Sequence, residues 1–199
     1  RTQRLHDDVE IMRGLAELRA WQRNDGWRQH DYDWYDDYTE DAPDSIDPRT
    51  RRPKAVPEGA DARGYSMLKE RKGIETRVLP KSFGPKTMEV VGLPLPKPGF
   101  YLVEAESRKL GNSLLGANKP MFVRTGALVT NLSAHLHYSD AEALIWVTTL
   151  DRAKPVADAD VRVRDCKGKP LLQGKTDAQG VAHLRGALPQ QQYNCPLFA

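Results

Sequence analysis

The sequence predicts a mainly β protein made of two consecutive antiparallel β-sandwiches, with one N-terminal amphipathic helix and an irregular acidic-aromatic insert. Two observations carry this prediction. Residues 144–150 form an apolar run rich in β-branched residues, which suits a strand and is too short for a helix. Further along, Val161 and Val163 alternate with charged residues, as in a strand with one buried face.

Turn residues separate the strands of this C-terminal half. Gly168 and Pro170 interrupt the pattern, because glycine accepts a positive φ and proline cannot donate to a ladder. Asp177 and Gly180 mark a second turn. The expected strands are 144–150, 156–163, 171–175 and 181–184. Consecutive short strands with such turns are typical of an antiparallel sandwich.

Upstream, strand patterns also recur after residue 86. We expect strands at 87–92, 100–107 and 121–125, with a proline-rich connection before Phe100. Gly126 predicts a bend at which the chain enters the second domain, whose first long strand would be 127–138. The predicted domains are therefore 1–124 and 125–199.

The N-terminal part contains the helix. Residues 5–22 carry apolar side chains at helical spacing, with Asp7, Asp8 and Glu10 at the start and Asn24–Gly26 at the end. A single helix needs a surface for its apolar face, so we expect it to dock on the first sheet or on a part of the parent protein outside this chain. Residues 48–64 have the composition of a linker.

Between helix and linker, residues 27–47 mix aromatic and acidic side chains. We interpret them as an acidic loop whose aromatic rings pack on the helix. Sugar binding, Ca²⁺ binding through carboxylates, and carboxylate-pair hydrolysis are the alternatives. The spacing does not match an EF-hand loop. The ligand surface would be formed by Trp27, Tyr32, Trp34 and Tyr35.

Composition limits the other function classes. The 199 residues carry a net charge of +3, which gives no electrostatic reason to bind nucleic acid. The sequence contains no apolar run long enough to span a membrane and no signal-peptide pattern. Because the chain begins at Arg1, we expect it to be a piece of a longer protein. No cofactor-binding motif is present.

The remaining candidate chemistry lies in two cysteines and three histidines. Cys166 and Cys195 fit neither a redox pair nor a zinc site, so they form either one structural disulfide or two unrelated thiols. His135 and His137 would share one side of a strand, where His183 could join them as a metal ligand. The alternative, which we adopt, is a polar outer face with no metal.

The same residues resemble a known family. The stretches Phe100–Glu104, Leu128–Asn131, Trp146–Val147 and Lys154–Val156, in that order, resemble the second and third macroglobulin domains of bacterial alpha-2-macroglobulins. The resemblance covers roughly residues 88–195, about half of the chain. It implies immunoglobulin- or fibronectin-like sandwiches that belong to the frame of a large protein that traps proteases after they cut it.

The resemblance also implies partners and a compartment. The partners would be target proteases, met through the full-length parent, and neighbouring macroglobulin domains of the same chain. The location would be the periplasm, with an inner-membrane lipoprotein as a further alternative. The thioester motif Cys-Leu-Glu-Gln of the family is absent, so we expect the chemistry of trapping to lie outside this chain. No catalytic motif is present either, and the resemblance implies frame domains, so we expect no enzymatic activity and no catalytic residue here.

A second function comes from a different class. Residues 27–47 could make this chain a carbohydrate- or cell-wall-binding sandwich module, with a cell-wall or membrane-associated partner. The resemblance does not explain this insert. Binding of muropeptides that is abolished by Trp34→Ala would favour the module over the frame.

Overall fold

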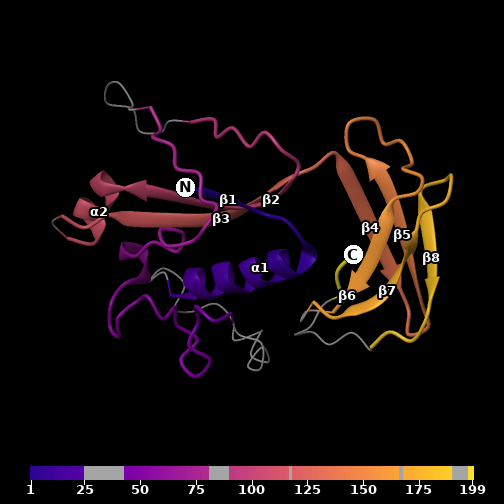
Figure 1. Ribbon diagram of the computed structural model, residues 1–199, viewed down its shortest axis with the longest axis horizontal. Helices are drawn as coiled ribbons and strands as arrows, with labels where there is room; N and C mark the ends of the chain where they lie inside the picture. The colour runs from indigo at the N-terminus through magenta and orange to yellow at the C-terminus, as the bar shows by residue number, and fades with distance from the viewer. Residues whose placement is uncertain (25–42, 81–89, 117, 166–167, 190–196) are drawn as a thin grey trace. The chain divides into compact units, whose positions relative to one another are not determined.

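The computed structural model describes residues 1–24, 43–80, 90–116, 118–165, 168–189 and 197–199. These residues form two units, the first containing 1–24 and 43–129 and the second beginning at Thr130 (Figure 1). The division falls between Val129 and Thr130, whereas the sequence placed it before Thr125. Among the described residues, no helix is both long and apolar enough to cross a membrane.

The first unit is built on a three-stranded antiparallel sheet in the order β1-β2-β3. The strands are β1 (Thr2–Leu5), β2 (Gly99–Ser107) and β3 (Met121–Val129). Strand β2 matches the predicted strand 100–107. Strand β1 was not predicted, and its pairing of Thr2 with Val103 joins residues that are remote in sequence.

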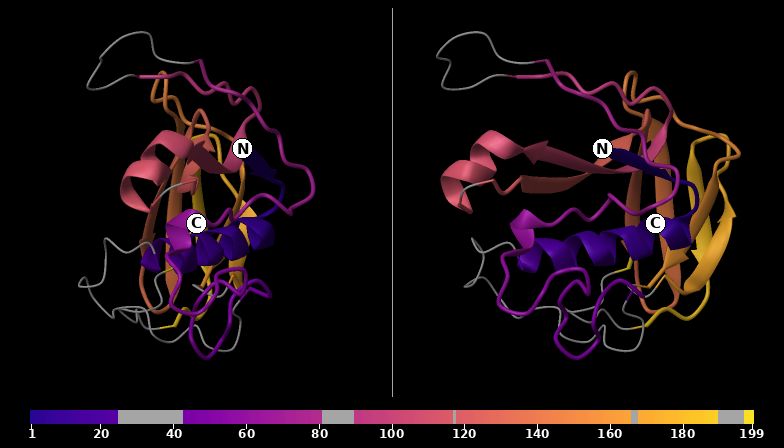
Figure 2. Two further views of the ribbon diagram at one scale, coloured as in Figure 1. Left: turned by 90° about the vertical axis from the view of Figure 1, so that its left-hand side faces the viewer. Right: turned by 60° about the vertical axis from the view of Figure 1, so that its left-hand side comes forward.

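Helix α1 (Asp8–Arg23) confirms the predicted helix. Its N-terminus is capped twice: the Asp7 carboxylate accepts from the Glu10 N–H at 2.8 Å, and the Glu10 carboxylate accepts from the His6 N–H at 2.7 Å. Leu18 and Trp21 are buried in the core with Leu102 of β2, so the helix docks on the sheet (Figure 2). Val9, expected on the apolar line, is instead exposed.

Residues 43–76 complete the first core, which corrects the prediction of a linker at 48–64. Pro53 and Ala62 are fully buried, and Leu68, also fully buried, belongs to the core cluster. The backbone turns are held by local bonds, such as the Arg52 guanidinium donating to the Ala60 carbonyl at 3.0 Å. The one regular helix of this segment is the short 3₁₀ helix Ala62–Gly64, and several residues of the segment are buried nevertheless. In the described part of this unit, α1 and this segment pack against the sheet.

Strand β3 also corrects the expected bend at Gly126. The strand runs straight through this residue and pairs with β2 over its whole length. A Cβ at Gly126 would lie 2.6 Å from the Phe100 ring, so glycine makes room for an aromatic side chain instead of turning the chain. The next strand begins at Leu132, where the Thr130 hydroxyl accepts from the Leu132 N–H at 2.9 Å.

The second unit is a two-sheet antiparallel sandwich, as predicted. One sheet has the order β4-β5-β8, with β4 (Leu132–Tyr138), β5 (Glu142–Thr149) and β8 (Val181–Arg185). The other pairs β6 (Asp160–Arg164) with β7 (Pro170–Lys175). Their inner faces share one core, whose buried members are Ala143, Ile145, Val147, Val161, Val163, Ala182 and Leu188.

The predicted turn at 177–180 is present and requires its glycine. The Gly180 N–H donates to the Asp177 carbonyl at 3.0 Å, and the Asp177 carboxylate accepts from the Val181 N–H at 2.9 Å. Gly180 has φ +76°, and a Cβ there would lie 2.5 Å from the Val147 carbonyl oxygen. The turn therefore packs its backbone directly on β5.

Candidate functional site

Several sequence-predicted site residues lie outside the described residues. They are Trp27, Tyr32, Trp34 and Tyr35 of the proposed ligand surface, together with Cys166 and Cys195. The structure therefore neither supports nor opposes a ligand surface or a disulfide at these positions. The chain near both cysteines is described, however: Arg164 and Phe198 exchange backbone hydrogen bonds of 2.8 and 2.9 Å.

The three histidines lie on one face of the β4-β5-β8 sheet without converging. His137 and His183 lie opposite Leu144 on its two sides, so β5 separates them. The centroids of the His135 and Trp146 rings lie 5.8 Å apart, with the ring planes tilted by 35°. In the described part of the chain, no three His, Cys, Asp or Glu side chains are placed to hold a metal ion.

This sheet face is better suited to contact than to chemistry. Leu144 and Trp146 are 40% and 44% exposed. Beside them, the His183 ring nitrogen lies 2.8 Å from the Glu142 carboxylate. An apolar centre with imidazole and carboxylate groups around it can pack against another polypeptide.

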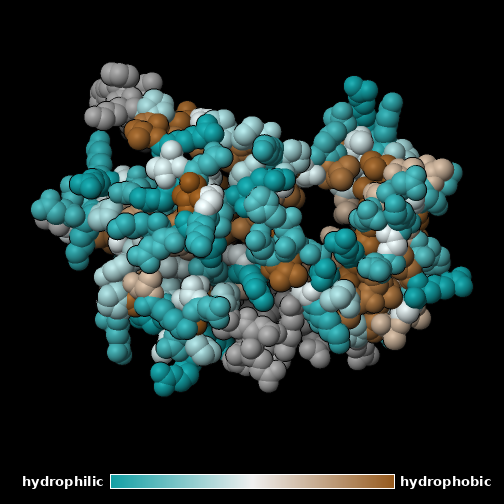
Figure 3. Space-filling model, in the orientation of Figure 1, coloured by the Kyte–Doolittle hydropathy of each residue, from teal (hydrophilic) through white to brown (hydrophobic). Residues whose placement is uncertain are grey.

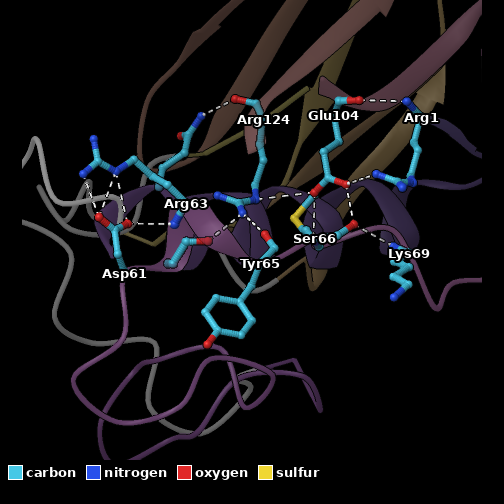
Figure 4. Close-up of polar contacts among 11 residues, drawn as sticks. Arg1, Asp61, Arg63, Tyr65, Ser66, Lys69, Glu104 and Arg124 are labelled. Atoms are coloured by element: carbon cyan, nitrogen blue, oxygen red, sulfur yellow. Dashed lines mark hydrogen bonds and ion pairs between the residues drawn. The ribbon is translucent and has the colours of Figure 1, made fainter. Parts of the chain in front are cut away.

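The strongest polar cluster lies in the first unit, on the sheet face covered by α1 (Figure 4). Glu104 of β2 and Arg124 of β3 are register partners, so their side chains share a face. Both side chains are 0% exposed, and the Arg124 Nε lies 3.6 Å from a Glu104 carboxylate oxygen. A buried carboxylate of this kind needs hydrogen bonds as well as a counter-charge.

Glu104 obtains those bonds from the 60–69 segment and from Arg1, which precedes β1. One carboxylate oxygen accepts from the Ser66 hydroxyl at 2.5 Å, and the other accepts from the Met67 N–H at 2.6 Å. The Arg1 guanidinium adds a third contact at 3.4 Å. The carboxylate thus ties a loop and two strands together.

Arg124 extends the same cluster towards the helix. Its guanidinium donates to the backbone carbonyls of Ala62, at 2.9 Å, and Tyr65. It also stacks over the Trp21 ring at 4.4 Å, a cation–π contact in a buried site. In addition, the Gln22 side-chain amide donates to the Arg124 carbonyl at 3.2 Å. Helix, loop and sheet are therefore joined through one side chain.

Two further ion pairs lie around this cluster. The Arg63 guanidinium donates to the Asp61 carboxylate at 2.6 Å, and this hydrogen bond lowers the pKa of Asp61 below its ordinary value of 3.8. Arg71 donates to Glu17 of α1 and to the Gln3 amide oxygen. Burial lowers the pKa of Arg71. The Asp61–Arg63 pair lies within residues 60–72, and the Arg71–Glu17 pair links this segment to helix α1.

The arrangement holds the unit together and offers no open reactive group. Both carboxylate oxygens of Glu104 are bonded within the protein, and the side chain is buried. The surface hollow of about 400 Å³ in this unit lies elsewhere and is lined by Gln3, Arg4, His6, Glu10, Arg71, Lys72 and Gly73. Arg4 is itself occupied, because it donates to the Pro98 carbonyl at 2.7 Å.

The sequence contained a signal for this cluster that we did not use. Glu104 follows Leu102 by two positions in an apolar strand, which places its carboxylate on the buried face. Arg124 follows Phe122 in the same way. A charge at each buried position of two adjacent strands indicates an internal ion pair.

Comparisons with known proteins agree with the sandwich. Residues 129–198 match the family model of the bacterial alpha-2-macroglobulin MG3 domain, which spans the whole β4–β8 sandwich. No curated protein matches the chain.

Two solved structures are also similar to this chain. A crystal structure of native Escherichia coli alpha-2-macroglobulin spanning domains NIE-MG1 is 18% identical, with a TM-score of 0.35, and the match covers 53% of this chain and 50% of that one. A second, spanning MG0-NIE-MG1, is 20% identical, with a TM-score of 0.33, over 52% and 34%. The chain thus spans half or less of these structures. Residues 129–198 are thus similar to the MG3 domain of bacterial alpha-2-macroglobulins.

Proposed function

We propose that this chain supplies frame domains of a bacterial alpha-2-macroglobulin-like protease inhibitor. In this proposal, an attacking protease cuts the full-length parent, which changes conformation and captures it. The observation that carries the proposal is the MG3 match over residues 129–198, which contains all the strands of the two-sheet sandwich.

The contacts of the described residues support a mechanical role for the chain. The first unit is braced by Glu104 and Arg124, whose bonds join two strands, the helix and the 60–69 segment. The second unit has its own apolar core. A unit with its own core can move as one body when its surroundings rearrange. We infer that the chain transmits the change of the parent and is not an enzyme.

The periplasm is the compartment that this proposal requires, whether the parent is free or lipid-anchored. A disulfide between Cys166 and Cys195 would be stable there. The antiparallel bridge between Arg164 and Phe198 supports this pairing. Cys166 follows Arg164 by two positions and Cys195 precedes Phe198 by three, so both cysteines are close in sequence to the bridged residues.

The test uses the full-length parent mixed with a broad-specificity protease such as trypsin. A captured protease keeps its activity on a small chromogenic peptide, which can diffuse to it, and loses activity on a large protein substrate. We expect activity on the large substrate to fall at least about tenfold more than activity on the peptide. Equal loss on both substrates, or no loss on either, would contradict trapping.

Two neighbouring residues of β5 give matched variants for the frame role. Ile145 is fully buried, whereas Leu144 is 40% exposed on the opposite face of the same strand. Ile145→Asp places a charge in the MG3 core, so it should unfold the domain and abolish trapping. Leu144→Asp should keep the fold, so trapping by this variant reports on the exposed sheet face alone and not on the core. If Ile145→Asp unfolds the domain and trapping persists, the domain is not part of the frame.

A further inference from the structure

The connection from Glu75 to Lys97 is anchored to the first unit at both of its ends. Glu75 and Thr2 of β1 exchange two backbone hydrogen bonds, of 2.8 and 2.9 Å. The Lys97 carbonyl accepts from the Tyr101 hydroxyl of β2 at 2.8 Å. Between these anchors, the described residues belong to no helix and no strand. The connection joins the N-terminal part of the unit, which contains β1 and α1, to the hairpin of β2 and β3.

Residues 76–80 of this connection are exposed along their whole length. Figure 3 shows that hydrophobic side chains of the first unit lie at its surface, and Val78, at 94%, is the most exposed large hydrophobic side chain in the described chain. The Arg77 guanidinium contacts the Glu75 carboxylate at 3.2 Å, and both side chains are exposed. In the described part of the chain, no backbone hydrogen bond reaches residues 76–80.

This segment has the properties of a protease substrate. A peptide bound in an extended conformation uses the backbone groups of several consecutive residues, and those of residues 76–80 have no partner among the described residues. Pro80 favours an extended backbone at Leu79, because it disfavours the helical conformation of the residue before it. The exposed Arg77 side chain matches the carboxylate in the specificity pocket of trypsin-like proteases.

We propose that the peptide bond between Arg77 and Val78 is a cleavage site for arginine-specific proteases. Hydrolysis adds one water molecule across this bond, which leaves a carboxylate on Arg77 and an amino group on Val78. The site goes beyond the proposed frame role and does not rest on it. In the frame, it is a bond that a protease can cut without dismantling the unit.

The first unit stays assembled after this cut because its two fragments share one core. Residues 1–77 supply β1 and α1, and residues 78–199 supply β2 and β3. Strand β1 keeps its four-residue register with β2. The buried cluster joins Leu18, Trp21 and Leu68 of one fragment to Leu102 of the other. All of these contacts lie within the first unit.

The buried polar cluster also joins the two fragments. Glu104 accepts from the Met67 N–H at 2.6 Å, and Arg124 donates to the Ala62 carbonyl at 2.9 Å. The cut removes none of these bonds. It removes only the covalent link, which holds the fragments at an effective concentration of about 1 mM. The fragments therefore separate only on strong dilution or in denaturant.

Limited digestion of the 199-residue chain tests the site. An endoproteinase that cuts only after arginine is used, and mass spectrometry gives the cleavage rate at each arginine. Arg152 is the matched control: its side chain is 70% exposed, but the Ala153 N–H of the bond to be cut donates to the Thr149 carbonyl at 3.0 Å. That turn must open before cleavage, so we expect the Arg77 bond to be cut at least about tenfold faster.

Two further measurements complete the test. Arg77→Gln should abolish the fragments 1–77 and 78–199 and leave the cleavage rate after Arg152 unchanged. In the cut wild-type chain, the two fragments should elute together from a size-exclusion column at about 10 µM and separate in a denaturing gel.

Either of two results would overturn this proposal. The first is cleavage after Arg77 that is no faster than cleavage after Arg152. The second is a cut chain whose fragments elute separately at about 10 µM, since the shared core would then not hold them. Trapping by the full-length parent does not require this cut, so the site can fail while the proposed function stands.

Discussion

Replacing Glu104 by glutamine is the most informative perturbation of the first unit. The substitution keeps the shape of the side chain and removes its charge. Arg124 would then remain fully buried without its counter-charge, and the new amide would direct an N–H₂ group towards donors that now meet carboxylate oxygens, those of Ser66 and Met67. Removing one partner of a buried pair costs about 3–5 kcal/mol.

The expected loss translates into a measurable rate. If exchange of the central amides of β2 and β3 requires unfolding of the unit, a loss of about 3–5 kcal/mol accelerates it roughly 10²- to 10⁴-fold. Hydrogen exchange followed by mass spectrometry gives this rate for each strand separately. Peptides from β5 and β8 serve as an internal reference, because they belong to the other unit.

Glu106 provides the matched control on the same strand. Its carboxylate contacts the Arg1 guanidinium at 2.9 Å, but the side chain is 31% exposed. Such an ion pair is worth at most about 1 kcal/mol, so Glu106→Gln should accelerate exchange less than about tenfold. Equal effects of the two substitutions, or no effect of Glu104→Gln, would show that the cluster does not stabilise this unit.

Three further predictions follow from particular contacts. Gly180→Ala should destabilise the second unit by about 2–4 kcal/mol, because the positive φ and the clash with the β5 backbone both add to the cost. Gly59→Ala has a positive φ but meets no atom within 4 Å, so it should cost only about 1 kcal/mol. Urea unfolding measures both losses. Because the pKa of Asp61 is lowered in the folded state, its carboxylate stabilises the first unit at pH values above the ordinary pKa of 3.8. This stabilisation is lost as the pH falls through the lowered pKa. Asp61→Asn should therefore reduce the acid sensitivity of the first unit. Non-reducing peptide mapping should find Cys166 crosslinked to Cys195.

Each of these three has a clear contrary result. Equal losses of unfolding free energy in the two glycine variants, each relative to the unsubstituted unit, would show that the contact of Gly180 with β5 does not matter. An unchanged pH dependence between pH 6 and pH 2 in Asp61→Asn would remove the role of that carboxylate in acid sensitivity. Two free thiols in protein purified from its natural compartment would undercut the periplasmic assignment.

The second unit was predictable because its signals are local. Val161 and Val163 alternate with charged residues within one strand, and Gly180 terminates a turn whose conformation few other residues accept. Such features are readable in windows of a few residues. The predicted start of the first strand of this unit, residue 127, was less accurate than its end, because glycine often ends a strand and Gly126 was read in that way. Position 126 needs glycine because the Phe100 ring, on the neighbouring strand, leaves no room for a side chain.

The first unit was harder to predict because its decisive contacts join distant residues. Strand β1 has only four residues, and Leu5 also fits the helical pattern that follows. Its partner β2 begins at Gly99. Likewise, Ser66 and Met67 stand in a segment without periodicity, and only the folded chain reveals that they bind Glu104. A period-two search for charges on apolar strands would have found Glu104 itself.

The central claim is that these domains act as a frame. The most direct measurement is hydrogen exchange of the full-length parent before and after it captures a protease. The account predicts that the core amides of β5 and of β2, such as Ile145 and Leu102, keep their protection in both states. Loss of protection at these amides on capture would contradict it, because the domains would then unfold instead of moving as intact bodies.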